Sequence, residues 1–393
     1  MTEWKEYKLG EVAEITSSKR IFYSEYVPNG VPFYRSKEII DLYNKRDVST
    51  ELFISEKRFK EISEKFGAPK EDDILLTSVG SLGIPYKVKP NDRFYFKDGN
   101  LTWFKDIDKE KLLPDYLMYW LSTGVGKQKL EEITIGSTQA AFTISGLKTI
   151  IIEIPSINTQ RQITSILTSL DDKIDLLRRE NATLEVMAET LFRQWFVVEA
   201  KEEWKEGGIS DLIEFNPTRK LAKDAVVPFL EMSNLSTSIY APTYWYNRAF
   251  SSGSKFRNGD TLLARITPCL ENGKTAYIDF LNENQIAWGS TEFIVMHSKL
   301  GLHSFFSYVI AKFQDFRDYA ESCMSGSSGR QRVDVENLKN YPILIPDEST
   351  IEKFNNKIET VVCKMHNNNV QIQTLIQTRD GLLPKLMSHE IKL

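Results

Sequence analysis

The chain has 393 residues, 41% of them hydrophobic and 11% aromatic, and this composition excludes a disordered protein. Its longest aliphatic runs, such as residues 149–152, are too short to cross a bilayer, and residues 1–6 lack the start of a secretory signal. The net charge of −4 argues mildly against a lone nucleic-acid-binding domain but allows basic and acidic faces on one protein.

The chain opens with a series of short strand and helix signals. Residues 31–35, 73–77 and 93–96 are β-branched or aromatic and are bounded by Gly, Pro, Asn or Asp, which predicts strands. Residues 111–121 look helical, and a strand at 151–155 closes the series at a proline. This mixture predicts a compact α+β domain.

The same series then recurs, and this internal repeat is the most informative feature of the sequence. Trp4 returns as Trp204, Asp73 as Asp260 and Pro155 as Pro346, so the spacing drifts as loop insertions would make it drift. We therefore predict two homologous α+β domains, each followed by its own connector. The expected limits are 1–155 for the first domain, 156–200 for the first connecting helix, 201–346 for the second domain, and 347–393 for the second connecting helix and tail.

Each connector carries a coiled-coil pattern. Thr159 with Gln162 and Ser349 with Glu352 are candidate capping boxes at the two helix starts. Apolar positions then alternate in steps of four and three, in the same register in both copies. The predicted seam consists of Leu170, Ile174, Leu177, Asn181, Leu184, Leu191, Val361, Met365, Asn368, Ile372, Leu375 and Leu382.

A long helix with such a stripe needs a partner, so we expect the two connectors to pair with each other. The alternative is that each helix only covers its own domain. The stripe is narrow and the other faces are polar, with Glu185 and Glu189 among them, which argues against this alternative. Asn181 and Asn368 within the seam would fix its register.

Signals of catalysis are weak throughout the sequence. Asn216-Pro217-Thr218 lacks the second proline and the aromatic residue of an adenine methyltransferase loop, and Gly273-Lys274-Thr275 follows Pro268 where a phosphate loop needs glycine. Four histidines and three cysteines lack metal-ligand spacing, so we expect no metal site and free thiols in a reducing cytoplasm. We expect no catalysis and no cofactor in this chain; a fused methyltransferase or nuclease is one alternative.

Basic and amide side chains recur on turn-rich segments of both domains. Arg and Gln can pair with guanine and adenine edges, and lysines contact phosphates. Small residues let backbone N–H groups approach an anion, and the helix starts at 143–145 and 334–336 would add positive potential. Solvated loops explain any single residue, but repetition of such loops at equivalent places favours a DNA interface for the set. The other alternative, a coiled-coil scaffold that binds proteins but not DNA, is separated by salt-dependent DNA binding. The candidate DNA-binding residues are Arg20, Tyr34, Arg35, Lys37, Ser137, Thr138, Gln139, Arg219, Lys220, Arg265, Ser327, Ser328, Arg330 and Gln331.

Several segments resemble the specificity subunits of type I restriction–modification systems, in the order of that family and over essentially the whole chain. The resemblance is carried by the opening Trp4–Ile15, the domain end with Gly136-Ser137-Thr138-Gln139, Leu147-Lys148 and Ile152–Pro155, the helix start Thr159-Gln160-Arg161-Gln162-Ile163, and the tail at 378–388. His389 departs from the family pattern, in which glycine is more typical, and residues 349–352 lack the Gln-Arg-Gln of the first helix start.

The resemblance implies two target-recognition domains, each recognising one half of an asymmetric, interrupted DNA sequence. It also implies that the two helices pair antiparallel within the chain and act as a ruler between the domains. The implied partners are double-stranded DNA and two modification subunits that bind S-adenosylmethionine and methylate adenine. Restriction subunits, which use ATP and Mg²⁺, are an optional addition. None of this chemistry falls on the chain itself, which we expect to act in the cytoplasm without membrane contact.

Overall fold

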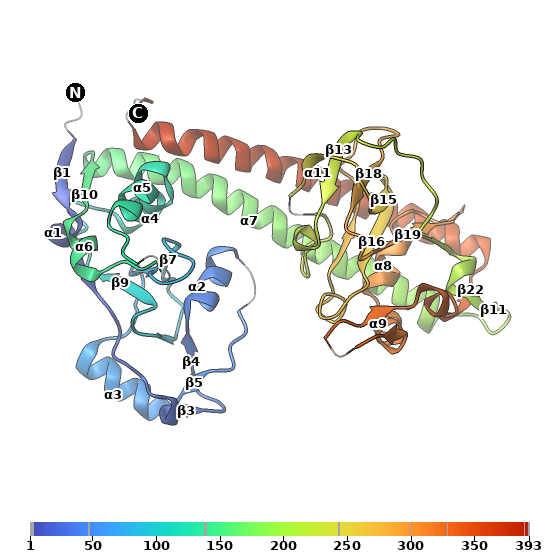
Figure 1. Cartoon of the computed structure of the whole chain (residues 1–393), viewed down its shortest axis with the longest axis horizontal. Helices are drawn as coiled ribbons and strands as arrows, with labels where there is room; N and C mark the ends of the chain where they lie inside the picture. Colours follow the sequence, from blue (N-terminus) through green and yellow to red (C-terminus); the bar gives the residue numbers. More distant parts are fainter. Residues whose placement is uncertain are drawn as a thin grey trace. The chain divides into compact units, whose positions relative to one another are not determined.

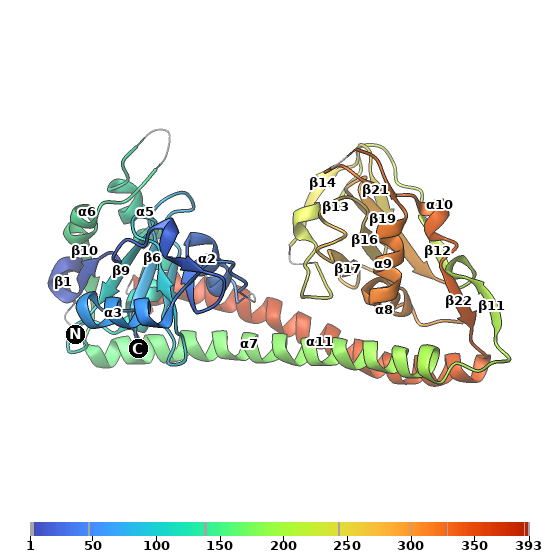
Figure 2. The same ribbon diagram turned by 90° about the horizontal axis from the view of Figure 1, so that it is seen from below.

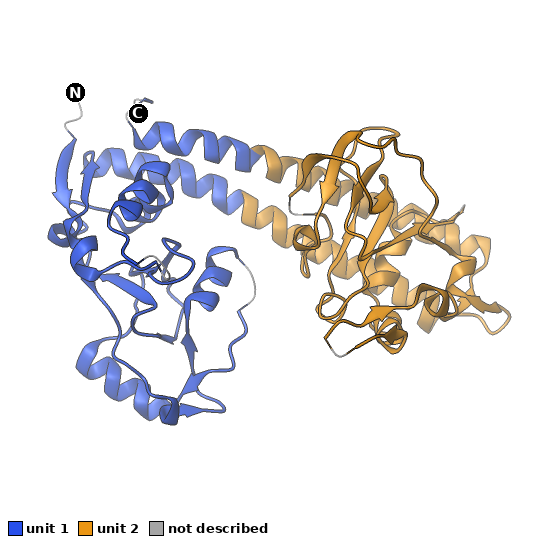
Figure 3. Ribbon diagram, viewed as in Figure 1, with its two compact units in different colours: residues 1–173, 375–393 blue, residues 174–374 orange. Residues whose placement is uncertain are grey.

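The computed structural model describes residues 4–45, 48–136, 140–242, 244–299, 301–327, 329–388 and 390–391. The chain forms two compact units, residues 1–173 with 375–393 and residues 174–374, and each is described by itself (Figure 3). The division falls within two long helices, so each unit holds one domain and a stretch of both helices. It does not test the predicted domain limits at residues 155 and 346, which stay a prediction.

The first domain begins at the N-terminus and ends where the first long helix starts (Figure 1). In chain order its elements are β1 (Lys5–Lys8), α1 (Leu9–Val12), β2 (Glu14–Thr16), η1 (Tyr23–Glu25), β3 (Tyr26–Val27), β4 (Val31–Tyr34), α2 (Ser36–Tyr43), β5 (Phe53–Ile54), α3 (Glu56–Phe66), β6 (Ile74–Thr77), β7 (Pro85–Lys87), β8 (Tyr95–Phe96), β9 (Leu101–Lys105), α4 (Pro114–Ser122), α5 (Gly124–Glu132), α6 (Ile144–Thr149) and β10 (Ile151–Ile154).

Two sheets form the centre of this domain, in the strand orders β2-β9-β6-β7 and β3-β5-β4-β8. The first is antiparallel, whereas β4 and β8 in the second run parallel. The packing of strand β6 explains its apolar sequence, because Ile74 and Leu76 lie in one core cluster and Leu75 lies in another. A strand covered on both faces is an uninterrupted apolar run rather than an alternating one.

The second domain lies between the two long helices in the chain. Its elements are β11 (Lys205–Gly208), η3 (Ile209–Asp211), β12 (Ile213–Phe215), β13 (Val226–Leu230), η4 (Met232–Asn234), β14 (Tyr246–Ala249), β15 (Ser254–Phe256), β16 (Asp260–Ala264), β17 (Thr275–Tyr277), β18 (Ala287–Gly289), β19 (Phe293–Ser298), α8 (Phe306–Lys312), α9 (Gln314–Ser322), β20 (Met324–Ser325), β21 (Arg332–Val333), α10 (Val335–Leu338) and β22 (Pro342–Ile345).

The second domain repeats the sheet plan of the first. Its sheets have the orders β12-β19-β16-β17 and β14-β13-β18-β15, and the parallel pair β13–β18 corresponds to β4–β8. Strand β16, like β6, is buried along its whole length. The predicted α+β class and the prediction of two homologous domains are therefore confirmed.

The long helices are α7 (Ile157–Arg193), which ends in the π-helical turn η2 (Gln194–Val198), and α11 (Glu348–Met387). In the second unit, Phe196 contacts Phe354 at a ring distance of 5.1 Å, whereas Asn368 donates to Asn181 at 2.9 Å. In the first unit, Arg379 donates to Asp171 at 2.7 Å. Within each unit the helices thus lie side by side and run antiparallel, as expected (Figure 2).

All residues of the predicted seam are buried or half-buried. Ile174, Leu177, Asn181, Val361, Met365, Asn368 and Ile372 are buried, and Leu170, Leu184, Leu191, Leu375 and Leu382 are half-buried. One buried asparagine on each helix, Asn181 and Asn368, distinguishes this seam from a purely apolar one.

The predicted capping boxes are wrong. Helix α7 begins at Ile157, and the Oγ of Ser156 accepts the N–H of Thr159 at 3.3 Å. Helix α11 begins at Glu348, and the carboxylate of Asp347 accepts the N–H of Thr350 at 2.8 Å. The capping residue in each copy is the one directly after the proline that ends the preceding strand, because proline stops the strand there.

The expectation that the polar face of α7 with Glu185 lies away from a domain is also wrong. Glu185 is only 7% exposed, and its carboxylate accepts hydrogen bonds from the Tyr308 hydroxyl (2.8 Å) and the Tyr240 N–H (3.0 Å) of the second domain. Phe192 of the same helix lies in that domain's core. The helices therefore pair with each other and also cover a domain, so the two interpretations of the stripe were not exclusive.

Candidate DNA interface

In the first domain, hydrogen bonds join loops that are far apart in sequence. The Ser18 hydroxyl donates to the carbonyl of Phe96 at 2.7 Å, and the Lys97 N–H donates to the carbonyl of Tyr34 at 2.9 Å. The segment at 96–97 thus lies between the two predicted basic segments, Ser18–Arg20 and Tyr34–Lys37. These candidates, separated in the sequence, are brought together where the parallel strands β4 and β8 end.

The same set of loops continues through Asn100 and Ser78. The Asn100 carbonyl accepts the N–H of Ser78 at 2.8 Å, and the Ser78 carbonyl accepts the N–H of Phe142 at 3.1 Å. Phe142 follows the Gly-Ser-rich segment of the first domain, whose Ser137, Thr138 and Gln139 lie outside the described residues. The described flanks of that segment are therefore joined to the other candidate loops.

The second domain holds its loops with equivalent backbone bonds. The Ser290 N–H donates to the Leu230 carbonyl at 3.2 Å, as Lys97 does to Tyr34. Arg265 donates its N–H to the Glu292 carbonyl at 3.0 Å and accepts the Val333 N–H at 2.9 Å, as Ser78 does with Asn100 and Phe142. The repeated sheet plan therefore produces a repeated loop cluster.

The candidate side chains of the first domain differ in their exposure and in the partners that they already contact. Arg20 is 65% exposed in its side chain, although it pairs with Asp98 at 3.0 Å, and Lys37 is exposed. Arg35 is half-exposed and pairs with Glu38 at 2.9 Å. Burial opposes ionisation of Glu38, but the hydrogen bonds from Arg35 hold its pKa below the usual value. Tyr34 stacks on Phe94 at a ring distance of 4.6 Å.

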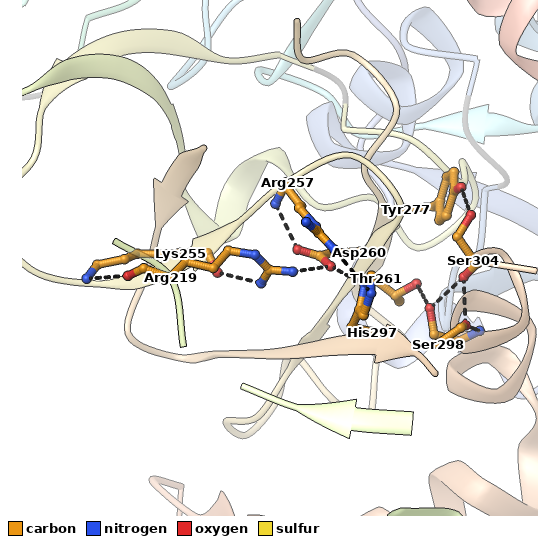
Figure 4. A network of polar contacts seen from close by, with 10 residues as sticks. Arg219, Lys255, Arg257, Asp260, Thr261, Tyr277, His297, Ser298 and Ser304 are labelled. Carbon is orange, nitrogen blue, oxygen red and sulfur yellow. Dashed lines mark hydrogen bonds and ion pairs between the residues drawn. The ribbon is translucent and has the colours of Figure 1, made fainter. Parts of the chain in front are cut away.

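In the second domain, Arg219 is held in a buried polar network (Figure 4). Its guanidinium donates to Asp260 at 2.7 Å, with side chains only 7% and 0% exposed. Asp260 also accepts from the Arg257 N–H at 2.8 Å and contacts His297 Nδ1 at 2.9 Å. Burial lowers the pKa of Arg219 and Asp260 partly offsets this. The adjacent Lys220 is exposed.

Asp260 is a site residue that the sequence argument missed, although the repeat contained its signal. Asp260 corresponds to Asp73, and both carboxylates accept a backbone N–H from three residues earlier, Arg257 in one copy and Lys70 in the other. The remaining partner differs, because Asp73 accepts from the Trp103 indole at 2.8 Å whereas Asp260 accepts from Arg219. The same turn is thus present in both domains, but the side chain that bonds its carboxylate differs.

A hairpin carries most of the remaining candidates of the second domain. Strands β20 and β21 flank a turn in which Ser327 and Arg330 are exposed, Gln331 is half-buried and Ser328 lies outside the described residues. Arg265 Nη2 donates to the Val333 carbonyl at 2.9 Å, so the structure brings Arg265 against this hairpin.

An ion pair that we did not predict anchors the hairpin. The Arg332 guanidinium makes a two-pronged contact with the Glu292 carboxylate at 2.6 to 3.0 Å. Hydrogen bonds from Arg332 hold the pKa of Glu292 below its usual value. No short motif in the sequence contains both residues, since forty positions separate them.

The two helix starts beside the Gly-Ser segments are already capped. The Thr143 hydroxyl accepts the Gly146 N–H at 3.0 Å, and the Asp334 carboxylate accepts the Glu336 N–H at 2.9 Å. A carboxylate at the start of α10 repels a phosphate, so the expected positive potential is not available there.

Among the described residues, no group of histidine, cysteine, aspartate and glutamate side chains is arranged to hold a metal ion. Over the same part of the chain, no helix combines the length and apolar character of a membrane-crossing segment.

Comparison with known proteins also divides the chain into two copies of one domain. Residues 1–186 and 201–374 match the model of the type I restriction modification DNA specificity domain. The chain is 25% identical to the MjaIX type I restriction enzyme specificity subunit of Methanocaldococcus jannaschii, over 99% of this chain and 94% of that protein. It is 24% identical to the HindI specificity subunit of Haemophilus influenzae over 100% of both. A crystal structure of a type I S subunit from M. genitalium shares the fold, with a TM-score of 0.57 at 16% identity over 98% of this chain and 96% of that one.

Proposed function

We propose, from the premise that this chain belongs to the type I restriction–modification DNA specificity family, that it selects the DNA target of a multisubunit complex. Each domain recognises one half of an asymmetric, bipartite duplex sequence. The observation that carries this proposal is the repeated loop cluster, in which Ser78 and Arg265 hold equivalent places with equivalent backbone bonds. Two similar loop clusters on one chain suit a ligand with two places to be bound.

The side chains on the two clusters support recognition of two different half-sites. Where the first domain has Ser78 and Asn100, the second has Arg265 and Glu292. The Ser78 side chain is 3% exposed and its hydroxyl lies 2.6 Å from that of Thr102, whereas Arg265 is half-buried and carries a guanidinium that can bond base edges. Carboxylate and amide groups also differ in the hydrogen bonds that they offer. A shared backbone frame with different side chains therefore explains how homologous domains would select unlike sequences.

We assign direct DNA contact first to the exposed candidates. Arg20, Lys37, Lys220 and Arg330 are exposed and can reach phosphates or base edges. Ser137, Thr138, Gln139, Ser327, Ser328, Gln331, Tyr34, Arg35 and Arg265 complete the proposed contact set. Arg219, which is engaged with Asp260, is expected to shape its loop rather than to touch DNA.

The chain is proposed to work by binding alone, in the cytoplasm. Modification subunits with S-adenosylmethionine would supply adenine methylation, and restriction subunits with ATP and Mg²⁺ would supply cleavage where they join. Exposed apolar side chains on the long helices, namely Leu176, Val186, Met187 and Val370, offer a surface for docking a modification subunit. Co-purification of modification subunits with the Leu176→Asp variant would argue against docking at that residue.

The decisive experiment maps methylated adenines in cells that carry the complex. Replacing residues 1–155 by the corresponding domain of another family member is expected to change one half of the methylated sequence and to leave the other half unchanged. A change in both halves, or in neither, would contradict recognition by two independent domains. Loss of all methylation when the whole chain is deleted is the control.

A further inference from the structure

A turn in the first domain exposes two aromatic rings that contribute little to the core of the domain. Phe22 is 61% exposed and Tyr23 is 88% exposed. The residues on either side are held by the core: Ile21 is 7% exposed within a hydrophobic cluster, and the Tyr26 ring packs on Phe33 at 5.2 Å. The turn is thus fixed at both ends while its two large apolar side chains face solvent.

Polar contacts hold the same turn in one shape. The Glu25 carboxylate accepts the N–H of Phe22 at 2.8 Å and pairs with Arg58 Nε at 2.7 Å. The Tyr23 ring makes a T-shaped contact with the Tyr26 ring, at a distance of 6.1 Å between ring centres. A turn that is already ordered loses little conformational entropy when its side chains bind a ligand.

Cations also lie next to this turn, since Lys19 and Arg20 come shortly before it in the chain and Lys19 links it to a third aromatic ring, that of Phe66. The Nζ atoms of Lys19 and Lys65 lie 5.2 and 5.4 Å from the ring centre of Phe66, which is itself 42% exposed. We call the set Lys19, Arg20, Phe22, Tyr23, Lys65 and Phe66 the aromatic–cation patch. Lysine is depleted in protein–protein interfaces, whereas aromatic rings flanked by cations are typical of nucleic-acid-binding surfaces.

The patch is continuous with the candidate interface of the first domain. Ser18 donates to Phe96, and the Lys19 N–H donates to the Tyr95 hydroxyl at 2.8 Å. The corresponding stretch of the second domain, Lys220-Leu221-Ala222-Lys223, has cations but no aromatic residue. At this place in the repeat, the aromatic pair is therefore present in the first domain and absent from the second.

We propose that Phe22 and Tyr23 form an apolar wedge that stacks on or between base pairs of the half-site recognised by the first domain. Lys19, Arg20 and Lys65 contact the phosphates on either side of the wedge. Aromatic and aliphatic wedges unstack base steps in many duplex-binding proteins and make recognition depend on how easily a step deforms. This inference rests on the proposed function and adds to it a means of recognition that the second domain lacks.

The test uses the assembled complex of the full chain with its modification subunits and a duplex containing the mapped target. 2-Aminopurine is placed in turn at each position of the first half-site except the adenine that is methylated, because a methyltransferase flips its target base out of the stack by itself. The fluorescence of 2-aminopurine rises when it is unstacked. The wild-type complex is expected to raise fluorescence at one step. Tyr23→Ala and Phe22→Ala should remove this rise and weaken binding roughly tenfold each, whereas Tyr23→Phe should retain both.

The salt dependence of DNA binding distinguishes the contribution of the wedge from that of the cations. Tyr23→Ala should weaken binding equally at every salt concentration, whereas Lys65→Ala should reduce the salt slope by about one. Tyr244→Ala, which removes a 61% exposed tyrosine of the second domain, should leave the fluorescence of the first half-site unchanged.

Three results would overturn the wedge. One is unchanged fluorescence and affinity in the Phe22→Ala, Tyr23→Ala double variant. Another is a wild-type complex with no fluorescence rise at any position of the first half-site. The third is loss of a modification subunit from that double variant with DNA binding intact, which would assign the patch to a protein partner. If the wild-type complex showed no sequence-specific binding at all, the proposed function itself would fail.

Discussion

Arg219 and Lys220 are neighbours in the chain with opposite surroundings. The Arg219 side chain is 7% exposed and bonded to the fully buried Asp260, and its carbonyl accepts from Lys255 Nζ at 3.1 Å. Lys220 is exposed. Adjacent cations can therefore have different functions, one structural and one for ligand contact, although the sequence presents them as one basic motif.

Replacing Arg219 by alanine should destabilise the second domain. The variant leaves the buried Asp260 with His297 and a backbone N–H but without its guanidinium, and removing one partner of a buried pair costs about 3 kcal/mol. Urea denaturation measures the loss. Lys220→Ala is the matched control, expected to keep stability while lowering the salt dependence of DNA binding; equal stability of both variants would refute the structural assignment.

Glu185 lies where α7 meets the second domain. Burial raises the pKa of this carboxyl to about 7, and its partners are the Tyr308 hydroxyl and the Tyr240 N–H. Nearby, the hydrogen bond with Asp279 raises the pKa of His366 on α11. In both groups the folded state holds a proton that the unfolded state releases at lower pH, so both stabilise the fold less as pH rises.

The stability of the chain should therefore fall between pH 5 and pH 8, and Glu185→Gln should fall less. The carboxyl is largely protonated in the folded state below about pH 7 and is released near pH 4.5 in the unfolded chain. Over this interval the difference between wild type and variant should change by up to about 2 kcal/mol. Denaturant midpoints at the two pH values measure it, and parallel pH profiles would contradict the assignment.

At the scale of elements, the pairing of α7 with α11 in the second unit contains a polar layer. Asn368 Nδ2 donates to Asn181 Oδ1 at 2.9 Å and to Glu180 at 2.9 Å, and Asn181 Nδ2 donates to Asn369 at 3.2 Å. Asn181 is 4% exposed and Asn368 is fully buried. Buried amides that bond across a helix pair specify one register, because a shift would leave them without partners.

Single and double substitutions of this layer should not be additive. Asn181→Leu or Asn368→Leu removes the bond between the two amides and leaves the other buried amide with one partner fewer, which should cost about 1–3 kcal/mol. The double leucine variant should recover most of that loss, since apolar residues in a seam pack without desolvation cost. A double-mutant cycle from urea denaturation tests this, and additive losses would show that the two amides act independently.

At the scale of the whole molecule, the first unit is assembled from both ends of the chain. Leu386 of α11 is 2% exposed and lies in the same core cluster as Ile163 and Leu167 of α7 and Leu147 of the first domain. The C-terminal residues thus complete a core whose other members lie more than 200 positions earlier. We therefore expect the stability of this unit to depend on the last turns of α11.

Leu386→Ala should destabilise the first unit by about 2–4 kcal/mol, because it leaves a cavity in a closed core. Limited proteolysis is expected to cut the first domain sooner while sparing residues 174–374. Leu176→Ala, which truncates a 51% exposed leucine of α7, is the matched control and should change little. Accelerated cleavage in both units would mean that the core is not confined to the first one.

The sequence by itself determined the repeat, the α+β class and the register of the two long helices. These features are encoded locally, since strand and heptad periodicities and a duplicated order of segments can be recognised without distant contacts. Spacing alone predicts that Ile174 and Met365 lie in the seam, and both are buried.

Only the tertiary structure decided which polar residues are free. Arg219 and Lys220 look alike in sequence, and Glu185 looks like an exposed helix residue, until partners from distant strands and helices bury them. The Arg332–Glu292 contact and the exposure of Phe22 and Tyr23 depend in the same way on where the sheets bring remote segments. Burial of a side chain follows from all its neighbours in space, and those neighbours are set by the whole fold rather than by local spacing.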